Sequence, residues 1–143
     1  MELSTTGAIL SFALGIEEEA LSFYEMIQSS GKCQGWGEVI DALCEEHRRA
    51  TRKLARLRRE SVTEMILEPI HGFRSDDYEL DVETSSDIDE QGYLALMKRI
   101  EANMSEFLKT AAVKTMFLQE VSLALDNLAK RRNRNLRSLE QLG

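Results

Sequence analysis

The sequence has few of the residues that interrupt helices: one proline, Pro69, and eight glycines among 143 residues. Aromatic residues make up only 6% of the chain. This composition excludes collagen-like, low-complexity and disulfide-scaffold proteins. It favours an all-α protein, because proline and glycine are the residues that helix interiors tolerate least. The length suits a single domain over residues 1–143, with enough buried surface for one hydrophobic core.

Cysteine, long apolar runs and an excess of positive charge are also lacking. Cys33 and Cys44 are the two cysteines, too few for a secreted disulfide framework. The apolar stretch 7–16 is about ten residues long, whereas a membrane-spanning helix needs roughly 20. The first four residues carry no positive charge of the kind that begins a signal peptide. We therefore expect a cytoplasmic protein that does not contact a membrane. The net charge of −7 also argues against nucleic acid as a partner of the whole molecule.

Apolar residues recur with the helical period through most of the chain. The pattern predicts four helices, over residues 6–27, 36–59, 90–112 and 114–142. The third and fourth are separated by no glycine or proline, so their boundary is the least marked. A long connection, roughly 61–90, contains Pro69 and an acidic stretch from Arg74 to Glu90. We expect it to be a solvated crossover, within which 65–67 could prolong the second helix.

The second half of the chain repeats the first. A shift of 84 residues places Glu17 on Glu101, and a shift of 85 places Asp41 on Asp126. Amphipathic helices match their leucines easily by chance, but they match acidic residues in phase less often. Two helical hairpins joined by a long crossover predict an antiparallel four-helix bundle of ferritin-like connectivity.

Glu17 and Glu101 fall within the apolar stripes of their helices. A buried carboxylate must be paired, hydrogen-bonded, protonated or bound to metal. Di-metal sites in bundles use one Glu from each of two helices and a Glu-x-x-His motif from each of the other two. The two glutamates therefore predict a polar or metal site at the centre of the bundle.

Several motifs resemble those of a known family. The motif E-x-x-A-x-x-F-Y at 17–24 resembles the first-helix signature of rubrerythrin-type ferritin-like proteins, and E-x-x-M-x-x-F at 101–107 is a weaker copy. The stretch 65–73, followed by Asp77-Tyr78, is similar to the crossover of uncharacterised rubrerythrin-like proteins. The resemblance covers about residues 7–142. It implies a ferritin-like bundle, metal-dependent oxidoreductase chemistry and association into a homodimer.

The chain departs from the family at the metal ligands. The family's second helix would read L-A-E-E-E-x-x-H, and aligning residues 43–46 with it puts His47 at the ligand Glu and Ala50 at the ligand His. Arg132 and Asn135 take the corresponding positions in the last helix. Four of the six ligands that the resemblance implies are thus replaced. No paired Cys-x-x-Cys motif is present, so the rubredoxin-like domain of true rubrerythrins is absent as well.

Two interpretations of Glu17, His47, Glu101, Arg132 and Asn135 follow. In the first, they form a polar core in which Arg132 bridges the carboxylates, no cofactor is bound, and the protein is non-catalytic with a structural or partner-binding role. In the second, Glu17, His47 and Glu101 form a reduced site for one divalent metal, zinc or iron, in a rubrerythrin-like oxidoreductase; a slipped alignment would add Glu46. The sequence does not decide whether the protein is an enzyme.

Basic residues gather on the second helix, with seven from Arg48 to Arg59, and on the fourth, with five from Lys130 to Arg137. We expect both helices to end at the same end of the bundle, with these cations solvated there. The alternative is docking to an unknown acidic protein partner or to the acidic crossover of a second copy. Cys33 lies in a glycine-rich loop and is expected to be exposed, whereas Cys44 is expected to be buried.

Overall fold

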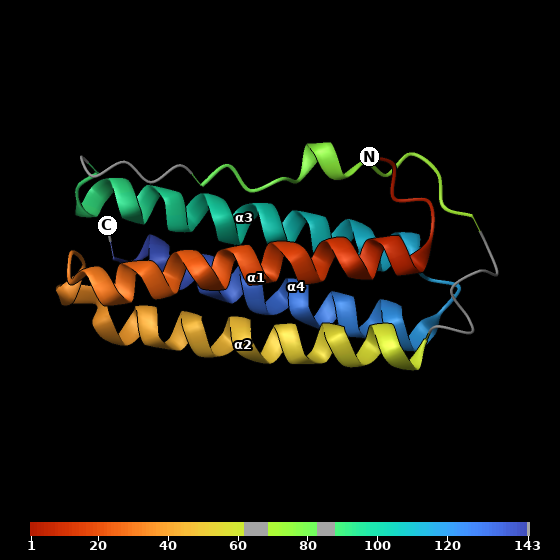
Figure 1. Ribbon diagram of the computed structural model, residues 1–143, viewed down its shortest axis with the longest axis horizontal. Helices are drawn as coiled ribbons and strands as arrows, with labels where there is room; N and C mark the ends of the chain where they lie inside the picture. The colour runs from red at the N-terminus through yellow and green to blue at the C-terminus, as the bar shows by residue number, and fades with distance from the viewer. Residues whose placement is uncertain (62–68, 83–87, 143) are drawn as a thin grey trace.

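The computed structural model describes residues 1–61, 69–82 and 88–142. Four long helices carry most of the chain: α1 (Thr6–Ser30), α2 (Gly37–Glu60), α3 (Glu90–Lys114) and α4 (Gln119–Glu140). They lie side by side along the long axis, with α1 and α4 running in one direction and α2 and α3 in the other (Figure 1). Over the described ranges, the predicted all-α fold with four long α-helices is confirmed. No strand is present in the described part of the chain, where Glu2 and Arg74 form an isolated antiparallel bridge.

Local signals explain where the helices begin and end. The side chain of Thr5 accepts a hydrogen bond from Ala8 N at 3.0 Å, and that of Asp89 accepts one from Gly92 N at 2.8 Å, so each caps the first turn of its helix. Gly31 ends α1 with φ of 70°, a left-handed conformation that glycine adopts at little cost.

The boundary between the last two helices differs from the prediction. Helix α4 begins at Gln119 rather than at Lys114, because residues 115–118 form a tight turn. Leu118 N donates to Thr115 O at 2.8 Å across this turn. The Thr115 hydroxyl donates to Ala111 O at 2.8 Å and so satisfies a carbonyl at the end of α3. The chain therefore turns without glycine or proline.

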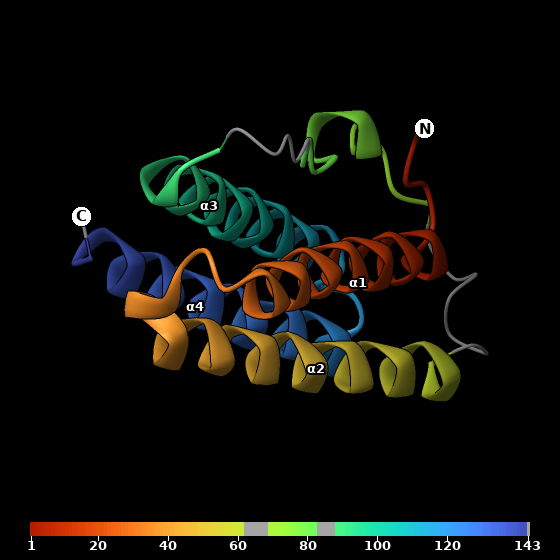
Figure 2. The same ribbon diagram turned by 60° about the vertical axis from the view of Figure 1, so that its left-hand side comes forward.

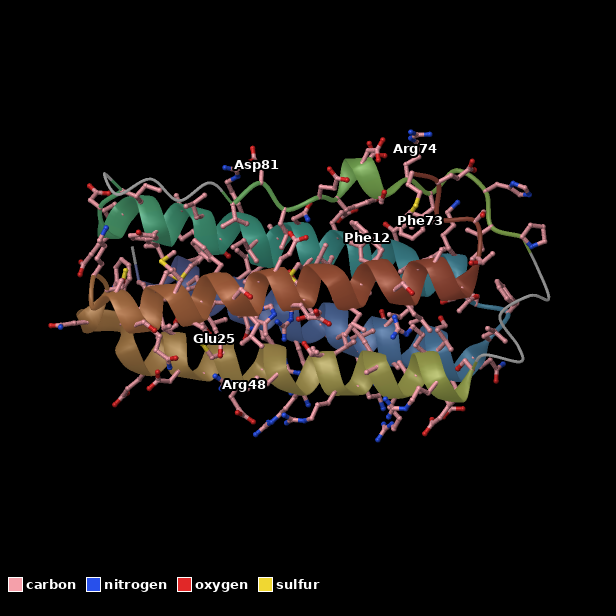
Figure 3. All side chains as sticks on the ribbon, in the orientation of Figure 1. Phe12, Glu25, Arg48, Phe73, Arg74 and Asp81 are labelled. Carbon is pink, nitrogen blue, oxygen red and sulfur yellow. The ribbon has the colours of Figure 1, made fainter. Side chains whose placement is uncertain are left out.

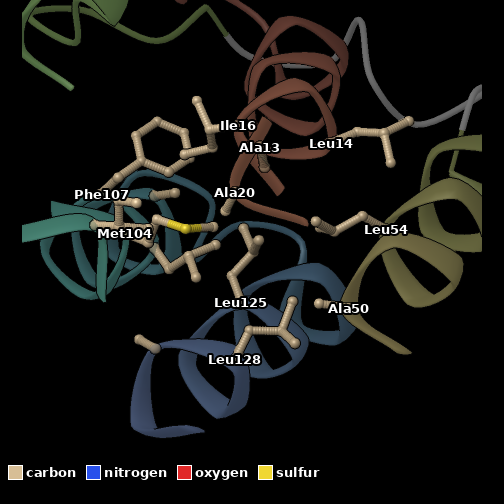
Figure 4. Close-up of a cluster of buried hydrophobic side chains, with 14 of the residues drawn as sticks. Ala13, Leu14, Ile16, Ala20, Ala50, Leu54, Met104, Phe107, Leu125 and Leu128 are labelled. Carbon is tan, nitrogen blue, oxygen red and sulfur yellow. The ribbon is translucent and has the colours of Figure 1, made fainter. Parts of the chain in front are cut away.

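The closest helix packing lies within two hairpins, α1 with α2 and α3 with α4 (Figure 2). All four helices contribute to one apolar core between them. Figure 4 shows a part of it in which Ala13 and Ile16 of α1, Leu54 of α2, Phe107 of α3 and Leu125 of α4 meet. A shared core of this kind fits one domain, since neither hairpin could bury its apolar face alone.

The crossover is only partly solvated, contrary to expectation. Leu3 N donates to Phe73 O at 2.7 Å and Ile70 N to Ser4 O at 2.8 Å, so the first residues pair with the crossover. Phe73 is 1% exposed and stacks on Phe107 of α3 at a centroid distance of 5.2 Å. Figure 3 shows Phe73 directed inward, toward Phe12 of α1. The expectation for 65–67 falls outside the described residues.

Two further expectations were wrong. Helices α2 and α4 end at opposite ends of the bundle, because the crossover returns the chain so that α3 runs parallel to α2 (Figure 1). Cys33 is 3% exposed rather than exposed, because the 3-10 turn Gln34–Trp36 brings it under the ends of α1 and α2. Cys44 is buried, as predicted, and burial raises the pKa of both thiols. No helix in the described residues is long and apolar enough to span a membrane.

Candidate functional site

The five residues predicted to share a site lie together in the middle of the bundle. Glu17 comes from α1, His47 from α2, Glu101 from α3, and Arg132 and Asn135 from α4. The first four are fully buried, with no exposed surface. The repeat places them there, since equivalent positions of the two hairpins face the same axis. We call this set, together with Glu46 and Tyr24, the polar centre.

His47 joins the two buried glutamates. Its Nδ1 lies 2.6 Å from Glu17 Oε2, and its Nε2 lies 2.9 Å from Glu101 Oε2. A ring that donates from both nitrogens is an imidazolium, and two carboxylates are the acceptors that this cation requires. The sequence predicted Arg132 as the bridge between the carboxylates. Arg132 does lie within ion-pair distance of both carboxylates, but the hydrogen bonds that join them come from His47, for which no bridging role was predicted.

This geometry shifts the pKa values of His47 and Glu101 in opposite directions. Burial alone would lower the pKa of His47, but the carboxylates of Glu101 and Glu17 outweigh it and raise the pKa to about 9. Burial would likewise raise the pKa of Glu101. His47, Arg132 and the amide of Asn135 overcome that effect and lower this pKa to about 2. His47 is therefore a cation and Glu101 an anion at neutral pH.

Arg132 is the second buried cation. Its Nη2 donates to Glu46 Oε2 at 3.1 Å, while its Nη1 lies 3.6 Å from Glu101 Oε1 and 3.9 Å from Glu17 Oε2. Its strongest bond is thus to Glu46 rather than to the two glutamates of the repeat. Although burial lowers the pKa of Arg132, the three carboxylates more than compensate and raise it.

The guanidinium also contacts the imidazole ring. Arg132 Nη1 lies 2.7 Å from His47 Nε2 and 3.0 Å from His47 Nδ1. Because the ring already directs both N–H groups at carboxylates, this is an approach of two cations rather than a hydrogen bond. Such an approach requires surrounding negative charge, which Glu17, Glu46 and Glu101 supply.

Asn135, Glu46 and Tyr24 complete the polar centre. Asn135 Nδ2 lies 2.9 Å from Glu46 Oε2 and also 2.9 Å from Glu101 Oε1, so one amide links the two carboxylates. The Tyr24 hydroxyl donates to Glu101 Oε2 at 3.0 Å. Burial, followed by the charge of Glu101, raises the pKa of Tyr24 well above its ordinary value.

Sequence reasoning assigned no role to Tyr24 and admitted Glu46 only through a slipped alignment. Tyr24 follows Glu17 by seven residues, which places both on one face of α1. This spacing was the available signal for Tyr24. Glu46 immediately precedes His47, and adjacent helical residues point in different directions. It reaches the centre from the side of α2 that faces α4, so spacing gave no signal for it.

The charges of the polar centre balance when its neighbour Arg131 is counted with it. Glu17, Glu46 and Glu101 are three anions, and His47 and Arg132 are two cations. The third cation is Arg131, whose Nη1 lies 3.4 Å from Glu46 Oε1 at the solvent edge. Paired and hydrogen-bonded groups are the form in which buried charges are tolerated, although Glu17 Oε1 and Arg132 Nε have no hydrogen-bond partner among the described residues.

The residues present do not fit a metal ion. A histidine ligand must offer a nitrogen lone pair, but both nitrogens of His47 are taken up by carboxylates. A dication would also add two positive charges to a balanced set, beside the buried Arg132. Within the described ranges, no group of three or more His, Cys, Asp and Glu residues has an arrangement that could hold a metal. What this centre can do chemically is hold charge and fix the four helices in register.

No protein-family model, curated protein or solved structure matches the chain. Any functional conclusion therefore rests on the polar centre and on the surface around it.

Proposed function

We propose that this chain is a rubrerythrin-like protein of ferritin-like type in which a cluster of ion pairs replaces the di-metal centre. In this role the protein is non-catalytic and needs no cofactor. The bundle is a scaffold, and its work is structural or the binding of a partner. The observation that carries the proposal is the position of Arg132, a permanent cation buried among three carboxylates.

The repeat supports the same proposal. Glu17 and Glu101, on the first helix of each hairpin, keep the carboxylates that a metal would need. The positions that would supply Glu-x-x-His carry His47 with Ala50 on α2 and Arg132 with Asn135 on α4. His47 and Asn135 hydrogen-bond to a retained carboxylate, and Arg132 lies within ion-pair distance of both. The donors thus satisfy the charge that a metal would otherwise neutralise.

A second candidate is the reduced metal site of Glu17, His47 and Glu101. It is favoured by the convergence of these three side chains, which leaves His47 between two carboxylates. Metal binding at this site would require the loss of a proton from His47 and a displacement of Arg132. Both changes cost free energy, because the carboxylates stabilise the charged forms of His47 and Arg132. We therefore place this candidate second.

The two candidates are distinguished by calorimetric titration of Zn²⁺, and of Fe²⁺ without oxygen, into the wild-type chain at pH 7. We expect no saturable binding to the wild type. We expect Arg132→Glu together with Asn135→His to gain affinity for both ions, because this pair restores one Glu-x-x-His arm. Adding Glu17→Gln should remove that gain, which controls for binding elsewhere. Stoichiometric binding to the wild type that Glu17→Gln abolishes would favour the reduced site instead.

A further inference from the structure

A groove of about 310 Å³ separates α2 from α4 on the outside of the bundle, beside the polar centre. The floor is apolar and built from small or branched side chains, with Ala50 on α2 and Ala124 and Leu128 on α4. Figure 4 shows Ala50 and Leu128 directed toward the space between the two helices. The alanines are too short to fill that space, so the helices do not close over it.

The rim of the groove carries an excess of positive charge. Arg49, Lys53 and Arg131 line it, and Glu46 is the one acidic residue among the lining side chains. Glu46 is already engaged by Arg132 and Asn135 on its inner side. Arg131 pairs with Glu46 as well, but three basic side chains against one acidic side chain still leave the lining of the groove with a net positive charge.

Two of the rim groups are uncommitted among the described residues. The two arginines of the rim already form ion pairs. Arg49 Nε lies 3.4 Å from Glu45 Oε1, and Arg131 Nη1 lies 3.4 Å from Glu46 Oε1. Lys53, which is half-buried, has no ion pair within the described ranges, and the amide of Asn127 on α4 has no hydrogen bond there. An ammonium and an amide beside an apolar floor leave donors available to an anionic ligand.

We propose that this groove binds a small organic anion, with a carboxylate or phosphate head on a short hydrocarbon body. The head lies at Lys53 and Asn127, within the field of Arg49 and Arg131, and the hydrocarbon body lies on Ala50, Ala124 and Leu128. Ligand pockets usually measure about 300 to 1,000 Å³, and the volume of the groove matches the lower end, which suits a small molecule. This site goes beyond the proposed function and does not depend on it.

The floor and the rim together determine which ligands fit. An inorganic anion would use the rim but leave the apolar floor in water. A neutral hydrocarbon would cover the floor but leave Lys53 without a counter-charge. A ligand with both parts gains from each, since burial of apolar surface adds to the charge-assisted hydrogen bonds.

The test is calorimetric titration of the full chain with four probes at low salt: octanoate, octyl phosphate, inorganic phosphate and octanol. We expect the two amphiphilic anions to bind in a 1:1 complex at least tenfold more tightly than phosphate or octanol. Whichever of octanoate and octyl phosphate binds more tightly shows whether the site prefers a carboxylate or a phosphate head. Affinity should fall as salt is added, because exposed charges are screened. Absence of saturable binding by both amphiphilic anions, or equal binding of octanol, overturns the proposal.

Variants locate the site. Lys53→Gln should weaken binding of the better probe at least fivefold, and Ala124→Leu should abolish it by filling the groove. The matched control is Arg134→Gln, which removes an exposed cation of α4 that does not line the groove. It should change affinity less than twofold. Circular dichroism checks the fold of each variant, and if Ala124→Leu fails to fold, Lys53→Gln decides the outcome. An equal loss in Lys53→Gln and Arg134→Gln shows unspecific attraction to basic helices and overturns the proposal.

Discussion

At the scale of the residue, His47 and Arg132 hold charges that the bundle could not otherwise bury. His47 stands between Glu17 and Glu101, and Arg132 ties Glu46 to the same cluster. Removing one partner from such a set leaves an uncompensated charge, which costs more than the pair contributes when intact. Stability should therefore respond strongly to protonation and to substitution at these two residues.

The pH dependence of unfolding tests His47. Its pKa rises from 6.5 to about 9 on folding, so its stabilising contribution is complete below pH 6.5 and is lost as the pH rises through 9. The pKa of Glu101 falls from 4.5 to about 2, so its contribution is complete above pH 4.5 and is lost as the pH falls through 2. These two groups predict a plateau between pH 4.5 and 6.5.

Urea denaturation at a series of pH values from 4.5 to 9 measures the free energy of unfolding that tests this prediction. The free energy of unfolding should fall by about 3 kcal/mol between pH 6.5 and 9, since one pKa unit corresponds to about 1.4 kcal/mol. His47→Gln should remove this fall in stability between pH 6.5 and 9. His71→Gln, which changes the other histidine, exposed on the crossover, should retain it. A wild-type profile that is flat from pH 6.5 to 9 would show that His47 is not held as a cation.

Substitution of Arg132 tests the second cation. Arg132→Leu should lower the free energy of unfolding at pH 7 by about 3 to 5 kcal/mol, as expected when one member of a buried ionic set is removed. The loss should be smaller at acidic pH, where the freed carboxylates can take up protons. Arg134→Leu, at an exposed position two residues further along α4, should change stability by at most about 0.5 kcal/mol. Equal losses for both variants at pH 7 would contradict a special role for Arg132.

Five of the seven residues of the polar centre could be predicted from the sequence, but Tyr24, Glu46 and the connections among the seven could not. The repeat placed Glu17 and Glu101 at equivalent depths, and the alignment brought in His47, Arg132 and Asn135. Helical phase reports the side of a helix on which a residue lies. It does not report which long side chain reaches which carboxylate, so the hydrogen bonds of His47 to both glutamates and of Arg132 to Glu46 were not predicted.

At the scale of the element, the helices are stabilised mainly by the packing of their apolar stripes. Leu43 on α2 and Leu128 on α4 are equivalent positions in the repeat, and both are buried. Replacing either with alanine should cost about 2 to 5 kcal/mol of unfolding free energy, as buried leucine truncations do. Leu123→Ala provides the control because Leu123 is 62% exposed. Losses below about 0.5 kcal/mol at both buried positions would mean that the assigned helical phase is wrong.

The same periodicity explains which boundaries the sequence predicted well. α1, α2 and α3 begin within one residue of the predicted positions, where Thr5 and Asp89 cap α1 and α3 and glycines precede α2. The start of α4 was misplaced by five residues because the turn at 115–118 is closed by a backbone hydrogen bond from Leu118 N to Thr115 O, which requires no glycine or proline. Burial of Phe73 was missed because its partner Phe107 is distant in sequence.

At the scale of the whole molecule, we predict a homodimer. The described acidic segment 74–82 and the helix α2, which carries the basic run from Arg48 to Arg59, lie on different sides of the bundle (Figure 1), so a second copy can bring opposite charges together. Two-fold pairing is the commonest arrangement among oligomers. Light scattering at high micromolar concentration should give twice the chain mass of 16.3 kDa. A monomer mass under those conditions would refute the prediction.

The central claim is that buried ion pairs around Arg132 stand where a ferritin-like protein would bind metal. The most direct test is metal analysis of the wild-type chain, purified without chelator or a nickel affinity column from cells supplied with iron, zinc and manganese. We predict less than one tenth of an equivalent of any of these metals per chain. A stoichiometric metal that is lost on Glu17→Gln and on Glu101→Gln would contradict the claim and assign the centre to the reduced metal site.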